Sequence, residues 1–252
     1  MTPDVVVDVG NTRIKRGVRG RDGTLNLGYF DPKWLHCDVF PVPLDKADAP
    51  TWVVAGSNAE RQAELVRWVR GELNNNVIEV TSYEQLPIDI EVDHPEKVGI
   101  DRLLGAVAAK RLRTPGRAAV TVDVGTATTV NLIDANGTFT GGLILPGVRL
   151  MLQSLHQNTS KLPLVESDGR RFANRTFPGK STEDAIRAGV SYAIAGAVRL
   201  ALDHAKVGDQ YPELFLTGGG YTAIADLLKD HRPRRVPALV LEGLWITAET
   251  LP

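Results

Sequence analysis

Short apolar runs, each bounded by turn residues, divide the chain into two halves that begin alike. The first run, 5–9, reads Val-Val-Val-Asp-Val, and a second run, 120–124, reads Val-Thr-Val-Asp-Val. Each run is followed at once by a glycine and a polar residue. Runs of this length and composition predict buried strands. We therefore predict that each half starts with a buried strand that carries an aspartate near its end.

Two further strands are predicted after each of these runs. Asp-Gly and Asn-Gly between apolar runs are strong hairpin signals, and each half contains one such pair. We predict a three-stranded antiparallel meander in each half, so that segments 4–34 and 119–146 superpose. The predicted second and third strands are 14–18 and 25–30 around Asp22 and Gly23, and 130–133 and 139–145 around Asn136 and Gly137.

Beyond each meander the apolar residues recur at helical spacing. In segment 58–73, for example, Leu65, Val66 and Val69 fall on one face of a helix. Ser181 and Asp184 have the spacing of a capping box, with Asp in place of Glu or Gln. The remaining predictions are helices at 101–113, 183–204 and near 224–229, and strands at 52–55, 77–80, 214–217 and 238–241.

This order of elements predicts an α/β protein made of two similar halves. Coincidence between two Val-rich strands is the alternative, but the matched turn spacing favours a duplication. Segment 113–117 contains Pro and Gly and is predicted to be a linker, which gives domains 1–115 and 116–252. The arrangement resembles the duplicated ribonuclease-H-like fold of the acetate kinase, actin and Hsp70 superfamily.

Composition narrows the possible partners and the compartment. The formal charge of −1 over 252 residues gives no electrostatic footprint for nucleic acid, and Arg232, Arg234 and Arg235 are interpreted as a solvated loop. Cys37 is the only cysteine, so no internal disulfide is expected, as in a reducing compartment. The N-terminal residues do not have the pattern of a signal peptide, and no apolar run approaches about 18 residues. We expect a cytoplasmic protein that binds neither nucleic acid nor membrane.

The two Asp–Gly turns are candidate phosphate sites. Glycine in a tight turn lets backbone N–H groups approach an anion, and short polar side chains can add hydrogen bonds. Such side chains are present as Asn11, Thr12, Thr126 and Thr128. An aspartate beside a phosphate requires a cation between them, so a nucleoside triphosphate with its metal, held by both turns across a cleft, fits the pattern. Lys15 is either a phosphate contact or a solvated strand lysine.

Two other glycine-containing motifs are less specific. Gly179, Lys180 and Ser181 imitate the end of a P-loop, but that motif needs a glycine where Asn174 stands and an apolar strand before it. Thr182 is either a helix-terminus residue or a ligand contact. The run 218–220 is three glycines between a predicted strand and helix, which suits either nucleotide contact or a plain turn.

These motifs, taken in order, resemble those of the type III pantothenate kinases over almost the whole chain. The matching segments are 8–15, 95–102, 122–129, 141–147, 179–182, 217–219 and 241–244. The resemblance implies ATP-dependent phosphorylation of pantothenate to 4′-phosphopantothenate, the first step towards coenzyme A. It also implies a homodimer.

The resemblance also implies roles for individual residues and the cofactors. Asp101 is expected to be the catalytic base that faces the pantothenate hydroxyl, and Asp123 to hold a monovalent cation, K⁺ or NH₄⁺, in addition to the divalent metal of ATP, Mg²⁺. The expected ATP contacts are Asp8, Val9, Gly10, Asn11, Thr12, Arg13, Ile14, Lys15 and Thr126, and the expected pantothenate contacts are Gly99, Ile100, Asp101, Arg102 and Thr182.

Some alternatives stay open. Val92 stands where many family members have an aromatic residue, often tyrosine, which puts the wall of the pantothenate pocket in question. Without the resemblance, the residues around Asp101 favour a helix cap over a catalytic base. Two rival functions are a sugar or acetate kinase of the same superfamily, and a catalytically idle nucleotide-binding protein that regulates a partner. The presence of Asp8, Asp101 and Asp123 favours an active enzyme over the idle protein.

Overall fold

The computed structural model describes residues 2–20, 24–30, 49–166 and 177–251, and it forms two compact units. The first unit comprises Met1–Leu112 and Ala238–Pro252, and the second comprises Arg113–Pro237. The predicted domains 1–115 and 116–252 differ from this division, because the C-terminal segment packs with the first unit. The predictions that concern Asp22, Gly23, Cys37 and Asn174 fall outside the described residues.

The first unit is built on a five-stranded sheet with the order β3-β2-β1-β4-β5. The first three strands pair antiparallel, as predicted, and β4 and β5 run parallel to β1. All five residues of β1 are buried, which explains its nearly continuous apolar sequence. The strands are β1 Val5–Val9, β2 Ile14–Arg19, β3 Leu25–Phe30, β4 Thr51–Gly56 and β5 Asn76–Glu79.

The second unit repeats this sheet. Its strand order, read from β8, is β8-β7-β6-β9-β10, which matches the first sheet strand for strand. Asp8 pairs with Lys15 on one side and Ala55 on the other, and Asp123 pairs in the same way with Thr129 and Thr217. The two aspartates therefore occupy equivalent positions. The strands are β6 Ala119–Val124, β7 Ala127–Ile133, β8 Phe139–Pro146, β9 Glu213–Thr217 and β10 Arg234–Arg235.

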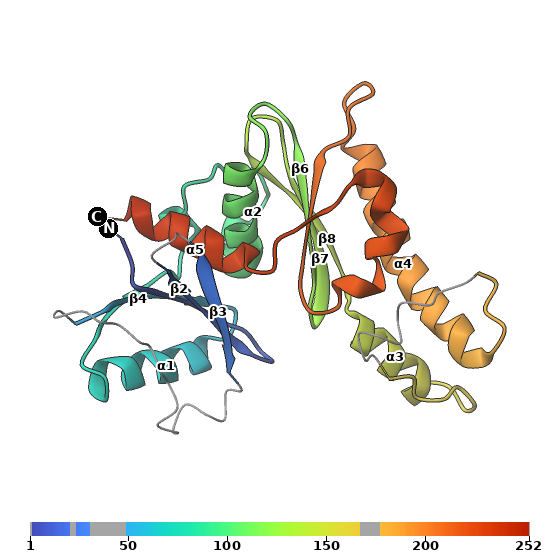
Figure 1. Cartoon of the computed structure of the whole chain (residues 1–252), viewed down its shortest axis with the longest axis horizontal. Coiled ribbons are helices and arrows are strands. Elements are labelled where there is room, and N and C mark those ends of the chain that lie inside the picture. The colour runs from blue at the N-terminus through green and yellow to red at the C-terminus, as the bar shows by residue number, and fades with distance from the viewer. Residues whose placement is uncertain (1, 21–23, 31–48, 167–176, 252) are drawn as a thin grey trace. The chain divides into compact units, whose positions relative to one another are not determined.

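Helices cover both faces of the first sheet, with α1 on one face and α2 and α5 on the other (Figure 1). Alternate residues of β1, namely Val5, Val7 and Val9, join Leu65 and Val69 of α1 in one hydrophobic cluster. Asn58 caps α1, because its side chain accepts from the N–H of Arg61. The helices of this unit are α1 Ala59–Gly71, α2 Ile100–Leu112 and α5 Leu239–Thr250, with short 3-10 helices at Tyr83–Gln85 and Pro95–Lys97.

The strand predicted at 238–241 is wrong, because these residues begin α5. A short apolar run does not distinguish a buried strand from a buried helix, and here the apolar pattern continues to Ala248. The short strand β10 takes the fifth place in the second sheet instead. Gly243 allows α5 to pack tightly on α2, since a Cβ there would lie 1.8 Å from the carbonyl oxygen of Leu104.

In the second unit, α4 contributes Ile186, Val190, Ile194 and Val198 to a core shared with β6 and β7. By length and composition α4 could also cross a membrane, which was not predicted from the sequence. The core helix of a soluble protein can have the same length and composition, and 44% of the apolar window of α4 is buried. The helices here are α3 Val148–Gln157, which was not predicted, and α4 Thr182–His204, with 3-10 helices at Tyr221–Ala223 and Ala225–His231.

Candidate functional site

The turn that follows β1 is fixed by backbone and side-chain hydrogen bonds. The N–H of Gly10 donates to the carbonyl of Arg13 over 3.1 Å, which closes the turn. From the amino end of α1, Asn58 donates to the side chain of Asn11 over 3.1 Å, and Arg61 donates to the carbonyl of Asn11. The turn therefore lies beside the start of a helix, where the backbone dipole favours an anion.

Asp8, at the base of this turn, is buried and forms an ion pair with a lysine of the neighbouring strand. Its side chain is 7% exposed, and the Nζ of Lys15 lies 3.5 Å from its Oδ2. The Lys15 side chain is 30% exposed and therefore only partly covered. Lys15 is therefore not simply a solvated strand lysine, because it forms an ion pair with Asp8. A contact of the same ammonium group with phosphate stays a prediction.

The turn after β6 is surrounded by glycines. The N–H of Gly147 donates to the carbonyl of Thr126 over 3.0 Å, and a Cβ at Gly147 would lie 2.2 Å from the carbonyl oxygen of Gly125. Gly218, with φ +86°, lies so close to Asp123 that a Cβ would meet its Oδ1 at 2.4 Å. A side chain at Gly218 would therefore clash, whereas a Cβ at the next residue, Gly219, would have no atom within 4 Å.

Asp101 stands at the amino end of α2 and is half-buried. Its Oδ1 accepts from the N–H of Arg102 over 2.9 Å and lies against Gly99, where a Cβ would be only 2.7 Å away. An ionised carboxylate has about four acceptor sites, so one backbone contact leaves room for a substrate hydroxyl. The side chain thus makes a first-turn helix contact and also keeps the capacity to act as a base.

Arg102 shares the half-buried surroundings of Asp101. Burial lowers the pKa of the Arg102 guanidinium, and the charge of Asp101 partly offsets this effect. A guanidinium remains protonated at physiological pH in any case. The segment therefore presents a carboxylate and a fixed positive charge on adjacent residues.

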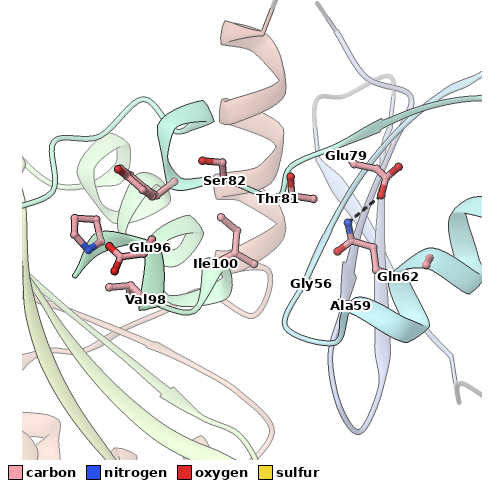
Figure 2. Close-up of a pocket in the computed structure, with 12 residues that line it drawn as sticks. Gly56, Ala59, Gln62, Glu79, Thr81, Ser82, Glu96, Val98 and Ile100 are labelled. Carbon is pink, nitrogen blue, oxygen red and sulfur yellow. Dashed lines mark hydrogen bonds between the residues drawn. The ribbon is translucent and has the colours of Figure 1, made fainter.

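A pocket of about 430 Å³ lies in the first unit, beside this segment (Figure 2). It reaches the carboxyl ends of β4 and β5, the edge where ligands bind in open α/β sheets. Gly56 lines the pocket and also packs against the backbone just before the first turn, so closely that a Cβ there would lie 2.4 Å from the carbonyl oxygen of Val9. The lining residues are Gly56, Ala59, Gln62, Ala63, Glu79, Thr81, Ser82, Tyr83, Pro95, Glu96, Val98 and Ile100.

Of the expected site residues, only Ile100 lines this pocket. Its polar wall was not predicted from the sequence; there Gln62 donates to Glu79 over 3.4 Å (Figure 2). Gln62 is 5% exposed and stands on the buried face of α1 with Leu65, Val66 and Val69. A polar residue within an apolar helical stripe is a signal that could have identified it. Because the charged residues of the lining, Glu79 and Glu96, are both acidic, the pocket disfavours anions.

Thr182 is the first residue of α4, and its side chain is exposed. The predicted cap is confirmed, because the N–H of Asp184 donates to the Oγ of Ser181 over 3.1 Å. Gly179 lies against this first turn, where a Cβ would be 2.5 Å from the backbone nitrogen of Ala185. Thr182 is therefore a first-turn residue of the helix and not its cap, which confirms the helix-terminus interpretation, while its contact with a ligand stays a prediction.

The expected residues are divided between the units. The first unit holds 8–15 and 99–102, and the second holds Asp123, Thr126 and Thr182. Thr128 is fully buried, and its Oγ1 has no hydrogen-bond partner. Within the described ranges no group of three or more His, Cys, Asp or Glu residues could hold a metal ion.

Comparison with solved structures identifies the fold. A putative N-acetylmannosamine kinase from Listeria monocytogenes matches with a TM-score of 0.58 at 13% identity and covers 98% of both chains. MreB 5 of Spiroplasma citri matches with a TM-score of 0.53 at 10% identity, covering 98% of this chain and 96% of its own. The predicted fold class, that of the acetate kinase, actin and Hsp70 superfamily, is confirmed.

Sequence comparison identifies the family. The family model described as type III pantothenate kinase matches residues 5–204. A type III pantothenate kinase from Azoarcus sp. is 37% identical over 257 residues, which are 97% of this chain and 90% of the relative. One from Bacteroides fragilis is 34% identical over 225 residues, which are 86% of this chain and 85% of the relative. The chain belongs to the type III pantothenate kinase family.

Proposed function

We propose that this protein transfers the γ-phosphoryl group of ATP to the hydroxyl of pantothenate and so forms 4′-phosphopantothenate for coenzyme A synthesis. The observation that carries the proposal is the family match over residues 5–204, which spans both Asp–Gly turns, the Gly99–Arg102 segment and Thr182. The printed names of the relatives give the substrate. The kinase fold supports phosphoryl transfer.

The proposed chemistry depends on positioning and charge. Phosphoryl transfer passes through a loose transition state, so that alignment and charge stabilisation supply most of the rate. Asp101 would orient the acceptor hydroxyl and take its proton, since its carboxylate is half-buried and retains free acceptor capacity. The fixed charge of Arg102 would lie next to it. The acidic pocket of Figure 2 is an unsuitable place for the carboxylate of pantothenate.

ATP would be held by residues of both turns. In the first unit these are Asp8 to Lys15, where the start of α1 and the Lys15 ammonium favour an anion. In the second unit Thr126 would contact the nucleotide and Asp123 would hold K⁺ or NH₄⁺. The donor set fits such an ion, because a half-buried carboxylate is a hard oxygen ligand. Mg²⁺ would neutralise the phosphates.

A homodimer is part of the proposal. The exposed large apolar side chains of the second unit include Ile144 at 65%, Leu150 at 40%, Tyr192 at 46% and Leu200 at 72%. Two of them stand on α4, which also carries small residues that let another helix approach closely. A second copy of the chain would cover this surface. We also propose a cytoplasmic location, as the composition suggests.

A coupled assay with the purified chain tests the function. Pantothenate, ATP, Mg²⁺ and K⁺ should give ADP and 4′-phosphopantothenate in equal amounts, and acetate or hexoses in place of pantothenate should give neither. Nucleotide binding without transfer would favour the idle regulatory protein. Transfer to a sugar or acetate instead would favour another kinase of the superfamily.

A further inference from the structure

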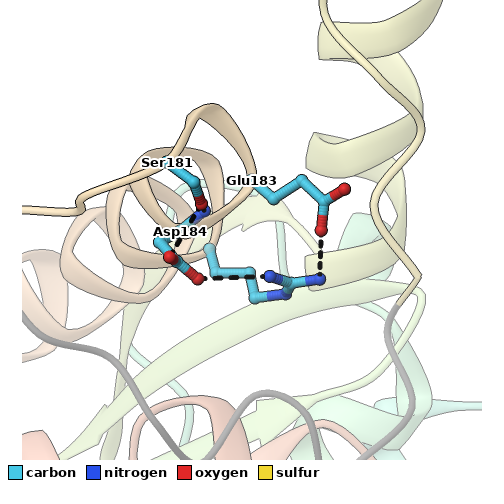
Figure 3. A network of polar contacts seen from close by, with 4 residues as sticks. Ser181, Glu183 and Asp184 are labelled. Atoms are coloured by element: carbon cyan, nitrogen blue, oxygen red, sulfur yellow. Dashed lines mark hydrogen bonds and ion pairs between the residues drawn. The ribbon is translucent and has the colours of Figure 1, made fainter.

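The amino end of α4 carries a network of four polar side chains (Figure 3). Ser181 donates through its Oγ to Asp184 Oδ2 over 2.7 Å, while the N–H of Asp184 donates back to that Oγ. Arg187, one turn further on, contacts Glu183 Oε2 at 3.0 Å through Nη2 and Asp184 Oδ1 at 3.4 Å through Nη1. One guanidinium thus joins both acidic residues of the first turn.

Arg187 is buried far more deeply than its partners. Its side chain is 14% exposed, against 56% for Glu183 and 44% for Asp184. Its Nε is buried without a hydrogen-bond partner, which has an energetic cost. Arg187 is the sixth residue of α4 and lies beyond its first turn, so its ion pairs with Glu183 and Asp184, four and three residues back, stabilise the helix slightly. Such pairs also form between fully exposed side chains, so helix stability alone does not explain why this arginine is only 14% exposed and leaves its Nε without a partner.

The charge of this segment supplies a better explanation. Residues 180–187 contain two acidic residues, Glu183 and Asp184, and two basic ones, Lys180 and Arg187, so the formal charge is zero. Loss of Arg187 would leave one net negative charge beside Thr182. Pantothenate carries a carboxylate, and an uncompensated acidic turn would repel it.

We infer that Arg187 is a positioning residue of the acceptor site, which neutralises the acidic first turn of α4 towards an anionic acceptor and fixes the turn on which Thr182 stands. This inference rests on the proposed function, which assigns Thr182 to pantothenate binding. Arg187 acts through Glu183 and Asp184 and has no contact with substrate in this account.

The test measures steady-state kinetics with pantothenate varied at saturating ATP. Arg187→Gln should raise KM for pantothenate about three- to tenfold, as expected for one unpaired charge at short range, with kcat nearly unchanged. Added salt should reduce the difference from the unaltered protein, because it screens exposed charge. Arg187→Lys, which keeps the charge, should restore most of the affinity. Glu183→Gln in the Arg187→Gln background should also restore it, because the formal charge returns to zero.

Two further variants complete the design. Arg199→Gln makes the same charge change on α4 about 18 Å further along the helix, well beyond the screening length of about 8 Å, and should leave KM unchanged. Glu183→Gln alone changes an exposed side chain, should fold normally, and should lower KM for pantothenate. This variant keeps the test valid if Arg187→Gln fails to fold.

The inference is overturned if Glu183→Gln leaves KM unchanged or raises it, or if a folded Arg187→Gln keeps the KM of the unaltered protein. It is also overturned if the effect of Arg187→Gln is insensitive to salt and to the second substitution, because a purely structural role would behave so. Failure of the unaltered protein to phosphorylate pantothenate would instead contradict the proposed function, so the two failures are distinguishable.

Discussion

The turns after β1 and after β6 hold equivalent places in two equivalent sheets, yet they differ in charge. Opposite Asp8, in the antiparallel register, stands Lys15, whose ammonium lies 3.5 Å from the carboxylate. Opposite Asp123 stands Thr129. The first aspartate is buried and the second is half-buried. A duplicated fold has thus kept the position of the carboxylate, while the residue opposite it on the neighbouring strand differs between the copies, lysine in the first and threonine in the second.

The helices that follow the fifth strands differ as well. In chain order α2 follows β5 and α5 follows β10, so they are equivalent, and both pack in the first unit. The start of α2 carries Asp101, whereas α5 starts with Leu239 and Val240. The duplication has therefore produced one polar and one apolar helix end, and the polar one carries the proposed base, Asp101.

Asp101→Asn removes the charge that distinguishes the start of α2 from the start of α5, and it should have the largest effect. The amide keeps the shape of the side chain and much of its helix-capping ability but removes the charge and the basicity. Turnover at saturating pantothenate should fall by roughly 10²–10⁴-fold if Asp101 is the base. Thermal melting and ATP binding serve as controls and should change little. Near-normal turnover in a folded variant would leave Asp101 as a helix-terminus residue only.

Gly243→Ala should break the contact between the two helices. The new Cβ would lie 1.8 Å from the Leu104 carbonyl oxygen, so α5 must move away from α2, and overpacking of this kind costs about 1–3 kcal/mol. Urea unfolding measures the loss. Gly71→Ala is the matched control, since Gly71 ends α1 with nothing within 4 Å, and alanine should stabilise it slightly. Equal stability of the two variants would contradict the tight α2–α5 packing.

Lys15→Met tests the difference between the two turns, and its effect should be smaller. It removes the built-in counter-charge of Asp8 and a positive charge from the proposed phosphate turn. We expect KM for ATP to rise about tenfold, equivalent to 1.4 kcal/mol. Lys229→Met removes an exposed lysine from the second unit and should leave KM unchanged. An unaltered KM in Lys15→Met would reduce Lys15 to an ion-pair partner of Asp8.

Most of the fold could be predicted because its signals are local. The Val-rich runs, the Asn-Gly turn at 136–137 and the cap at Ser181 each specify their own conformation. The strand predicted at 238–241 failed because tertiary burial, not local pattern, decides whether an apolar run becomes helix α5. The packing of α5 with the first unit likewise depends on contacts distant in sequence, such as that of Gly243 with Leu104.

The candidate site was predictable where a motif carries the chemistry. The pairing of Lys15 with Asp8 and the contact of Asp101 with the N–H of Arg102 depend on side-chain geometry that spacing does not specify. Gln62 and Glu79 lie 17 residues apart and meet only because α1 and β5 pack together. The roles of the individual residues stay predictions until variants are measured.

The proposal with the widest consequence is that a monovalent cation bound at Asp123 is needed for activity. The direct test compares activity in K⁺ and in Na⁺ at equal ionic strength, for the unaltered protein and for Thr129→Lys, which places a lysine opposite Asp123. We predict that the unaltered protein is far more active in K⁺ and that Thr129→Lys, if folded by thermal melting, depends less on K⁺. Equal activity of the unaltered protein in the two salts would contradict the account.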